Sequence, residues 1–487
     1  MIEQISRVDW LNRNPIVKKY IETNPTGWQT LPEFSIWPDA HDIDGISEHQ
    51  AEQLSKSLSG RIGLFGGSPG TGKTYCVAKL ITHMLKSGVV ADYEIGVGAP
   101  TGKAAVRLTE GLERNGISIR ARTWHSILGF GTDDSGGFAH DENNPLPYRV
   151  LFGDEMSMMD VALMLAVFKA RATNCSFLIV GDVNQLPPVG NGAPLRDMIA
   201  AGLPYGELKE IKRNSGGIVE ACASIRDNKP WLHFANFSMN KDSNLRVTGD
   251  DTDETKFESI IEEIGAAQIK GLDPVWDCQV LVAVNESSKL SRKALNELLQ
   301  DTLNPGPKYD GTSFRPSDKI VCLKNGWYRT TNDIAHSPDI KNDNNEVYVA
   351  NGELAEVLRI ENGSIVAELE NPARVVAISI KKPSNEEGTA ATGSNWDLGY
   401  ALSVHKSQGS EWPVAIVVLD SYAGARMICD RSWIYTAISR GQSRTVLVGD
   451  GDLAERFCRV TKITQRKTFL KELIGIELFK REAMEDL

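Results

Sequence analysis

Residues 67–74 read Gly67-Ser68-Pro69-Gly70-Thr71-Gly72-Lys73-Thr74, which is the phosphate-loop pattern G-x-x-x-x-G-K-[ST]. An apolar run, Ile62–Gly66, precedes the loop, and apolar residues at helical spacing follow it. Backbone N–H groups at such a helix start cradle nucleotide phosphates, while the lysine reaches the β- and γ-phosphates and the threonine hydroxyl ligates Mg²⁺. All eight loop residues are therefore predicted to bind ATP, with Lys73 catalytic and Thr74 a ligand of Mg²⁺.

Composition narrows the class of protein. A chain of 487 residues, 41% of them hydrophobic and 24% charged, is typical of a soluble globular protein with more than one domain. No apolar run reaches the length of about 18 residues that suggests a membrane span, and the N-terminus lacks the apolar region of a secretory signal. Seven scattered cysteines favour a reducing compartment over an iron–sulfur or zinc site. We therefore expect a cytoplasmic protein of a bacterium or of a phage-infected host.

The net charge of −11 restricts how the chain can bind nucleic acid. A protein that binds DNA with its whole surface is usually basic. Any nucleic-acid site must therefore be a local groove lined by Lys, Arg and backbone N–H groups.

The alternation of apolar runs predicts an α/β fold with two parallel sheets. The first domain, 46–225, has candidate strands at Ile62–Gly66, Ile95–Ala99, Arg149–Gly153 and Phe177–Gly181, and the second, 276–470, at Gln279–Val284, Ala415–Leu419 and Thr445–Val448. A predicted β-hairpin at about 129–147 interrupts the first domain, and a strand-rich stretch at about 310–395 interrupts the second. The rest is an accessory segment (1–45), a connection (226–275) that includes a polar, exposed loop at 239–258, and a C-terminal tail (471–487).

Two further strand ends carry chemistry. Val150–Glu155 has the form of a Walker B element, in which Asp154 holds Mg²⁺ and Glu155 orients and deprotonates the attacking water. Phe177–Pro188 ends in G-D-x-x-Q-L-P-P, so Gln185 is placed to sense the γ-phosphate.

The order of these motifs resembles the superfamily-one (1B) DNA helicases of the RecD/Dda type. Six further segments resemble motifs of that family, the last two being the most specific: Ile46–Gln50 (Q motif), Ala99–Ala105 and Thr123–Leu128 (DNA-contacting motifs), Leu208–Asn214 (motif IV), Ser403–Glu411 (motif V) and Tyr435–Arg440 (motif VI).

The resemblance implies two RecA-like domains with a pin-like hairpin insertion (1B) and an SH3-like β insertion (2B). It implies that Gln50 reads the adenine, that Arg213 and Arg440 act on the γ-phosphate, and that Gly409 and Glu411 belong to the ATP site. The implied DNA contacts are Pro100, Thr101, Lys103, Thr123, His125, Ser403, His405 and Lys406. Trp124 is either a base-stacking residue or part of the core.

The function implied is that of an ATP-dependent 5′-to-3′ single-stranded DNA translocase and helicase, a monomer that acts on forked DNA in replication, repair or recombination. In that reading Phe130 or Phe138 of the hairpin caps the last base pair. Two alternatives remain open: a motor subunit of a recombination nuclease complex, and an ATP-gated DNA clamp that does not unwind. A small-molecule kinase would leave Gln185 and Arg440 unexplained.

Overall fold

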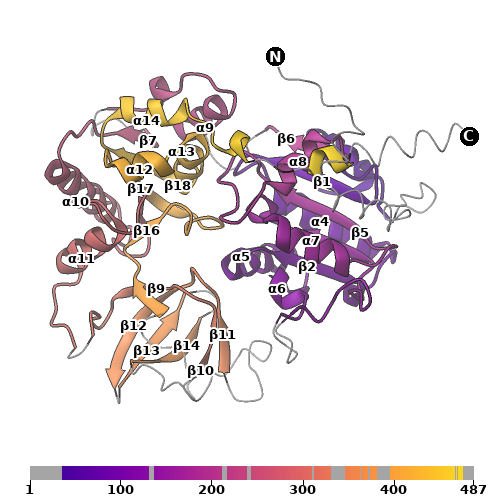
Figure 1. Ribbon diagram of the computed structural model, residues 1–487, viewed down its shortest axis with the longest axis horizontal. Coiled ribbons are helices and arrows are strands. Elements are labelled where there is room, and N and C mark those ends of the chain that lie inside the picture. Colours follow the sequence, from indigo (N-terminus) through magenta and orange to yellow (C-terminus); the bar gives the residue numbers. More distant parts are fainter. Residues whose placement is uncertain are drawn as a thin grey trace, which may run out of the picture.

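The computed structural model describes residues 36–130, 137–210, 216–237, 243–309, 312–330, 346–361, 363–370, 373–380, 395–466, 468 and 470–474. Residues 1–35 of the accessory segment, the predicted hairpin turn at 131–136, Arg213 and most of the C-terminal tail lie outside these ranges. Figure 1 shows two α/β domains side by side, with a β-rich unit packed below the second one. Among the described helices, none is both long enough and apolar enough to cross a membrane.

The first domain is built on a six-stranded parallel sheet in the order β3-β2-β4-β5-β1-β6. Leu64 and Phe65 of β1, the strand between β5 and β6, project to opposite faces, and each joins a separate buried core. The four predicted strands are confirmed, and the structure adds one at each edge. The strands are β1 (Ile62–Gly67), β2 (Ile95–Ala99), β3 (Arg122–Thr123), β4 (Val150–Gly153), β5 (Ser176–Gly181) and β6 (Tyr205–Leu208). The helices are α3 (Glu48–Ser57), α4 (Lys73–Lys86), α5 (Gly102–Glu113), α6 (Trp124–Ile127), α7 (Val161–Ala170) and α8 (Pro194–Ala200).

The second domain contains a five-stranded parallel sheet in the order β16-β8-β17-β18-β7. Its three predicted strands are confirmed. The strands are β7 (Leu245–Val247), β8 (Cys278–Val282), β16 (Ala401–Ser403), β17 (Trp412–Val418) and β18 (Gly441–Val448). The helices are α9 (Gly217–Arg226), α10 (Asp253–Ile269), α11 (Arg292–Leu303), α12 (Ala423–Ile428), α13 (Arg431–Ile438) and α14 (Gly451–Cys458).

The prediction of an exposed loop over 239–258 is wrong for the part that the structure describes. Leu245 and Val247 are fully buried in β7, which pairs with β18, and α10 begins at Asp253 behind the Thr252 cap. Two buried apolar residues at strand spacing are too few to stand out against a polar stretch. Helix α9 ends at Arg226, one residue beyond the predicted border of the first domain, yet it shares its core with α13 and therefore packs with the second domain.

The strand-rich insertion forms a seven-stranded antiparallel sheet in the order β11-β10-β14-β13-β12-β9-β15. This confirms the predicted β insertion. The strands are β9 (Lys319–Cys322), β10 (Gly326–Thr330), β11 (Glu346–Val349), β12 (Leu354–Glu361), β13 (Ser364–Leu369), β14 (Arg374–Ser379) and β15 (Trp396–Leu398).

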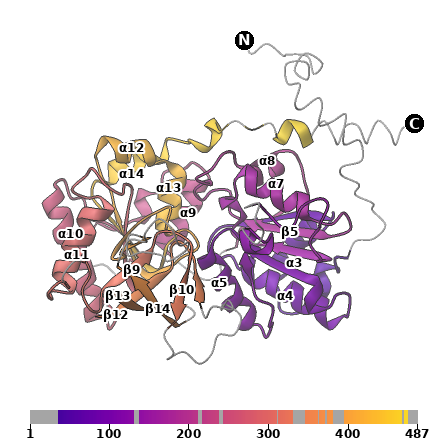
Figure 2. The same cartoon turned by 60° about the horizontal axis from the view of Figure 1, so that its bottom comes forward.

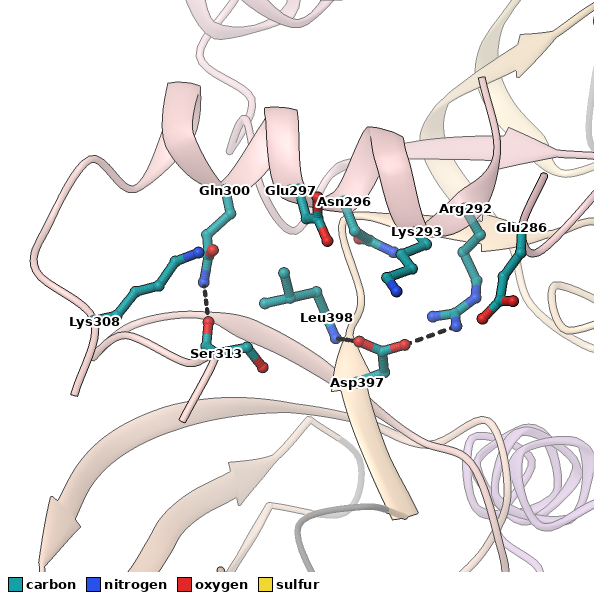
Figure 3. Close-up of a pocket in the computed structure, with 10 residues that line it drawn as sticks. All are labelled: Glu286, Arg292, Lys293, Asn296, Glu297, Gln300, Lys308, Ser313, Asp397 and Leu398. Atoms are coloured by element: carbon teal, nitrogen blue, oxygen red, sulfur yellow. Dashed lines mark hydrogen bonds and ion pairs between the residues drawn. The ribbon is translucent and has the colours of Figure 1, made fainter. Parts of the chain in front are cut away.

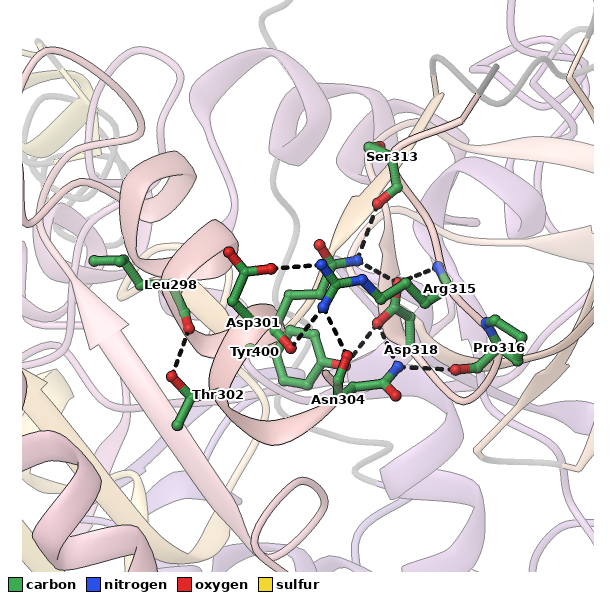
Figure 4. Close-up of polar contacts among 10 residues, drawn as sticks. Leu298, Asp301, Thr302, Asn304, Ser313, Arg315, Pro316, Asp318 and Tyr400 are labelled. Carbon is green, nitrogen blue, oxygen red and sulfur yellow. Dashed lines mark hydrogen bonds and ion pairs between the residues drawn. The ribbon is translucent and has the colours of Figure 1, made fainter. Parts of the chain in front are cut away.

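A buried polar network fastens this sheet to α11 of the second domain (Figure 4). The Asp318 carboxylate accepts hydrogen bonds from the side chains of Gln300, Asn304 and Tyr400 at 2.6–2.9 Å. The Arg315 guanidinium donates to the carbonyls of Gln300 and Asn304 at 3.1 and 2.7 Å. A buried carboxylate satisfied by several donors is costly to rearrange, so the insertion is held in a defined orientation.

After α14 the chain returns to the first domain as a strap, residues 463–474, of which 467 and 469 are not described. Figure 2 shows it crossing from the second domain toward α8. Arg466 donates to the Gly190 carbonyl at 2.7 Å, and Arg196 of α8 donates to the Arg466 carbonyl at 3.1 Å. Leu470 and Ile474 pack against a core of the first domain. The two α/β domains are therefore bridged a second time, independently of their central linker.

Candidate nucleotide site and nucleic-acid interface

The phosphate loop lies at the carboxyl end of β1, which is the edge where parallel sheets bind ligands. Gly70 and Gly72 have φ values of +78° and +92°, in the left-handed region that favours glycine. A Cβ atom at Gly67 would lie 2.9 Å from the Leu208 carbonyl oxygen. The local sequence therefore specifies a tight loop that turns directly into α4.

Strand order brings the predicted catalytic groups together. Because β4 lies next to β5 and β5 lies next to β1, the residues after these strands share one edge of the sheet. The Thr74 hydroxyl donates to Asp154 at 2.9 Å, so the two predicted Mg²⁺ ligands are in direct contact. The Lys73 ammonium donates to the carbonyls of Gly67 and Ser68 at 2.7 and 3.3 Å. Oxygen ligands beside a lysine are the chemistry that a nucleotide with Mg²⁺ requires.

Glu155 has the features of a catalytic carboxylate. Its φ of +53° is unusual for a residue with a side chain, and such backbone strain clusters at functional sites. Burial, together with the neighbouring Asp154 carboxylate, raises the pKa of Glu155, while Lys73 and Arg440 oppose that rise. A carboxylate with a raised pKa is a stronger general base than an ordinary one.

Gln50 braces the loop from α3. Its side chain and that of Ser47 form a capping box, in which the Ser47 backbone N–H donates to Gln50 Oε1 at 3.0 Å. Gln50 Nε2 donates to the Thr71 carbonyl at 3.4 Å. The structure thus places Gln50 beside the phosphate loop, as the sequence predicts, and its contact with adenine stays a prediction.

Residues after β5 connect the first domain to the second. The Tyr435 hydroxyl of α13 donates to the buried Asp182 carboxylate at 2.8 Å. Burial, together with Asp182, raises the pKa of Tyr435 well above its ordinary value. Gln185 is 3% exposed, its side chain makes no hydrogen bond within the described chain, and its role at the γ-phosphate stays a prediction.

The backbone of Leu186 is held from both sides by the second domain. Its N–H donates to Thr436 Oγ1 at 2.8 Å, and its carbonyl accepts from Gln408 Nε2 at 3.0 Å. The Leu186 side chain is 3% exposed and packs in the core of the second domain. The Leu186 side chain therefore acts as an apolar plug, meaning that it comes from the first domain and is buried in the second.

Arg440 reaches the nucleotide site from the second domain. It is 2% exposed, and its guanidinium donates to the Thr436 and Ser410 carbonyls at 3.0 Å and to Ser439 Oγ at 2.9 Å. It is close enough to Glu155 to oppose the rise of that residue's pKa. Motif VI therefore lies near the Walker B element, and the action of Arg440 on the γ-phosphate stays a prediction.

Residues of motif V contact the first domain at α5. The Glu411 carbonyl accepts from Arg107 of α5 at 3.1 Å. Gly409 has a φ of +73° and lies against Ala104, also on α5. Both residues thus meet α5 of the first domain, and their contact with nucleotide is still untested.

The predicted DNA contacts occupy the carboxyl ends of three strands: Pro100 and Thr101 follow β2, Thr123 ends β3, and Ser403 ends β16 with His405 and Lys406 just after it. Thr101 and Thr123 cap α5 and α6. The Lys103 ammonium lies 4.9 Å from the ring centroid of Trp412 on the second domain. Burial lowers the pKa of Lys103 to about 7.

The β insertion contacts both α/β domains next to the predicted DNA-binding residues. Lys406 Nζ donates to Asn351 Oδ1 at 2.9 Å. A Cβ atom at Gly102 would lie 2.1 Å from the Ala350 side chain, so the start of α5 touches the same loop of the insertion. Burial lowers the pKa of Lys406 and of His405. All three parts of the molecule therefore contribute to the predicted DNA groove.

An aromatic cluster stands at the base of the predicted hairpin. Phe130 and Phe138 form an antiparallel bridge, and their rings lie 5.4 Å apart. The His125 ring packs against both at 5.7 and 6.0 Å, and burial lowers its pKa. Trp124 is fully buried, so of its two predicted roles the core role is confirmed.

A separate cavity of about 250 Å³ lies at the junction of α11 and the β insertion (Figure 3). Lysines, an arginine, carboxylates and amides line it, and Arg292 and Asp397 form an ion pair there at 2.7 Å. It contains none of the residues singled out in the sequence, which gather instead at the boundary between the two α/β domains.

Comparison with known proteins agrees with this geometry. Residues 50–191 match the family model of an AAA domain, and residues 398–448 match that of the UvrD-like helicase C-terminal domain. The chain is 31% identical over 436 residues to the ATP-dependent RecD2 DNA helicase of Deinococcus radiodurans, a match that covers 88% of this chain and 52% of the relative. The chain is a homologue of the RecD2 and RecD proteins.

Other RecD-type proteins match over a similar stretch. The RecBCD enzyme subunit RecD of Mycolicibacterium smegmatis is 26% identical over 441 residues, covering 85% of this chain and 73% of that subunit. The chain spans about half the length of the RecD2 relative. A structure of two coordinating Pif1 helicases at forked duplex DNA aligns with 90% of this chain and 98% of that chain, at 16% identity and a TM-score of 0.48.

In this RecD homologue, the structure brings to the boundary between the two domains three residues whose contacts were not predicted from the sequence. Arg107 follows Lys103 by one helical turn on α5, so the helical spacing from the quoted motif is a signal that could have identified it. Tyr435 lay within motif VI, but its partner Asp182 is 253 residues away. Arg226, whose contact is described below, carried no sequence signal at all.

Proposed function

We propose that this chain is an ATP-driven motor that translocates 5′ to 3′ along single-stranded DNA and unwinds duplex DNA. The observation that supports this proposal most directly is that motif VI of the second domain meets the first domain beside the predicted nucleotide residues. Tyr435 donates a hydrogen bond to Asp182, and Arg440 opposes the rise of the Glu155 pKa. Hydrolysis at such a site depends on the domains being closed, which couples ATP turnover to their relative movement.

The chemistry assigned to each group follows from its contacts. Lys73 would bind the β- and γ-phosphates, and Thr74 with Asp154 would hold Mg²⁺, which would neutralise phosphate charge. The Glu155 carboxylate orients the attacking water and accepts its proton. Arg440 stabilises the charge that develops on the γ-phosphate, as an arginine finger does. Arg213, outside the described residues, is proposed to act beside it.

DNA is proposed to lie across the carboxyl ends of β2, β3 and β16. Small hydroxyls such as Thr101 and Thr123 and the cations Lys103 and Lys406 suit contacts with the sugar-phosphate backbone, which carry no sequence information. Because Lys103 touches Trp412 on the other domain, a bound strand would sense domain closure directly. The chain's net charge of −11 fits a groove of this kind better than a basic surface.

The hairpin at 129–147 is proposed to be the pin that separates the strands. Phe130 is 57% exposed while Phe138 is partly buried against His125, so Phe130 presents an aromatic face from a packed base. Each base-pair step costs on the order of 1.4 kcal/mol to unstack, and a wedge prevents re-pairing. Phe130→Ala should spare translocation and ATP hydrolysis but slow unwinding; unwinding at the wild-type rate would remove the pin from the proposal.

The test of the whole proposal is strand displacement on matched duplexes with a 5′ or a 3′ single-stranded tail, with ATP and Mg²⁺. Displacement only from the 5′-tailed substrate is expected. Displacement only from the 3′-tailed substrate would retain the motor but refute the polarity. ATP hydrolysis stimulated by single strands without displacement from either substrate would favour the clamp.

A second candidate is a motor subunit of a recombination nuclease complex. The matches to RecBCD subunits favour it, because those relatives are named as parts of a larger enzyme. A chain that hydrolyses ATP alone but unwinds only after addition of a co-purified partner would support it. Action as a cytoplasmic monomer is part of the main proposal, and unwinding by the isolated monomer would support that.

A further inference from the structure

Arg226 is a cation of the second domain that reaches the phosphate loop. It is the last residue of α9, whose apolar residues Ile218, Ala221 and Ile225 belong to the core of the second domain. Its Nη1 donates to Ser68 Oγ at 3.3 Å. The contact therefore joins the two domains, although the sequence placed Arg226 only at the start of the connection (226–275).

Ser68 of the phosphate loop accepts hydrogen bonds from a cation of each domain. It is 3% exposed, its carbonyl accepts from the Lys73 ammonium at 3.3 Å, and its hydroxyl accepts from Arg226. The Ser68 side chain is also near enough to the Tyr435 phenol to oppose the rise of the Tyr435 pKa. Two cations, one from each domain, thus converge on the loop residue that follows β1.

The guanidinium is arranged so that one side is anchored and the other faces the loop. Arg226 Nε pairs with Asp227 at 3.0 Å, and the arginine side chain is 17% exposed. A serine hydroxyl is a weak acceptor for a guanidinium, whereas phosphate oxygens accept stronger, charge-assisted bonds from it. A partly buried arginine held beside the lysine that binds the β- and γ-phosphates is suited to an anion at that end of the nucleotide.

We propose that Arg226 contacts the terminal phosphate of bound ATP, as a second arginine supplied by the second domain beside Arg440. This inference rests on the proposed ATPase function and adds a binding residue to it. Arg226 exchanges Ser68 for the γ-phosphate, so the second domain distinguishes ATP from ADP through two separate elements, α9 and the end of α13.

The test compares the affinity of the full chain for ADP and for a slowly hydrolysed ATP analogue, each with Mg²⁺. In Arg226→Ala, analogue binding should weaken about tenfold while ADP binding stays within twofold, because only the triphosphate offers the γ-phosphate acceptor. Arg226→Lys should recover part of the loss, since it keeps the charge but not the forked geometry. The matched control is Arg456→Ala, an arginine of α14 that is 58% exposed and pairs with Asp450.

The outcomes are distinct. Equal weakening of ADP and analogue binding in Arg226→Ala would show that the residue only supports the loop, and unchanged binding of both would show no role; either overturns the inference. A wild-type chain that binds nucleotide but does not hydrolyse ATP would overturn the proposed function, while the ratio of the two affinities would still decide the role of Arg226. A wild-type chain that binds neither nucleotide overturns both.

Discussion

Leu186→Ala is expected to uncouple the two α/β domains. Leu186 belongs to the first domain by sequence, yet its side chain is 3% exposed in the core of the second. Its backbone hydrogen bonds to Thr436 and Gln408 do not require the leucine side chain and can persist in the variant. The substitution therefore removes the apolar plug while leaving the polar contacts chemically available.

The size of the effect follows from the atoms removed. Leucine loses three carbon atoms on conversion to alanine, and at about 0.8 kcal/mol for each buried methylene the closed arrangement loses about 2.4 kcal/mol. When the domains separate, the side chain meets water, so this free energy acts on closure. It corresponds to a factor of about 60 in the equilibrium between closed and open domains.

The assay is steady-state ATP hydrolysis with saturating single-stranded DNA, paired with equilibrium binding of ADP. Stimulated kcat should fall by as much as about 60-fold, because Arg440 acts only when the domains are closed. ADP affinity should stay within twofold, because Lys73 and the phosphate loop are untouched. Strand displacement should fall at least as much as hydrolysis.

The matched control is Leu453→Ala on α14. Leu453 is 5% exposed and belongs to the same buried core, but it comes from the second domain itself. It removes the same atoms without touching the boundary between domains. If both variants reduced stimulated kcat equally, or if Leu186→Ala retained more than a third of the wild-type value, the plug would have no role in coupling.

Three further outcomes are expected. Because burial and Asp154 raise the pKa of Glu155, the acid limb of the kcat–pH profile should lie above the ordinary carboxyl range, with activity lost as pH falls through that raised pKa; Glu155→Gln should lower kcat at least 100-fold and abolish this limb. Because the pKa of Lys103 is about 7, affinity for single-stranded DNA should decrease as pH rises from about 6 to 8, and Lys103→Arg should remove that dependence, as fluorescence anisotropy would measure. Arg440→Ala should lower kcat about 1000-fold while ATP affinity changes only a few-fold, and parallel losses in titration calorimetry and turnover would instead mark Arg440 as structural.

Much of the candidate site was predictable from local sequence. The loop from Gly67 to Thr74 is recognisable because glycines at fixed spacing are needed for a left-handed turn into a helix. The acids Asp154 and Glu155 are recognisable because they end a fully apolar strand, and their meeting with Thr74 follows once a parallel sheet is inferred. Motif VI pointed to Arg440 in the same way, through a short, specific pattern.

The contacts between segments far apart in the chain were not predictable in this manner. Nothing around Leu245 or Val247 distinguished a buried edge strand from a loop, since pairing with β18 decides it. The strap from 463 to 474 reads as the end of the second domain until its contacts with α8 are seen.

The sequence by itself determined the phosphate loop and the Walker B acids, because each of these motifs consists of residues within a few positions of one another. Only the tertiary structure decided how the second domain enters the site. Leu186, Arg226 and Tyr435 act across more than 150 residues of chain in each case, through packing and hydrogen bonds that short-range patterns do not encode. The physical reason is that closure depends on complementary surfaces formed by distant segments, whereas a phosphate loop is complete within one turn.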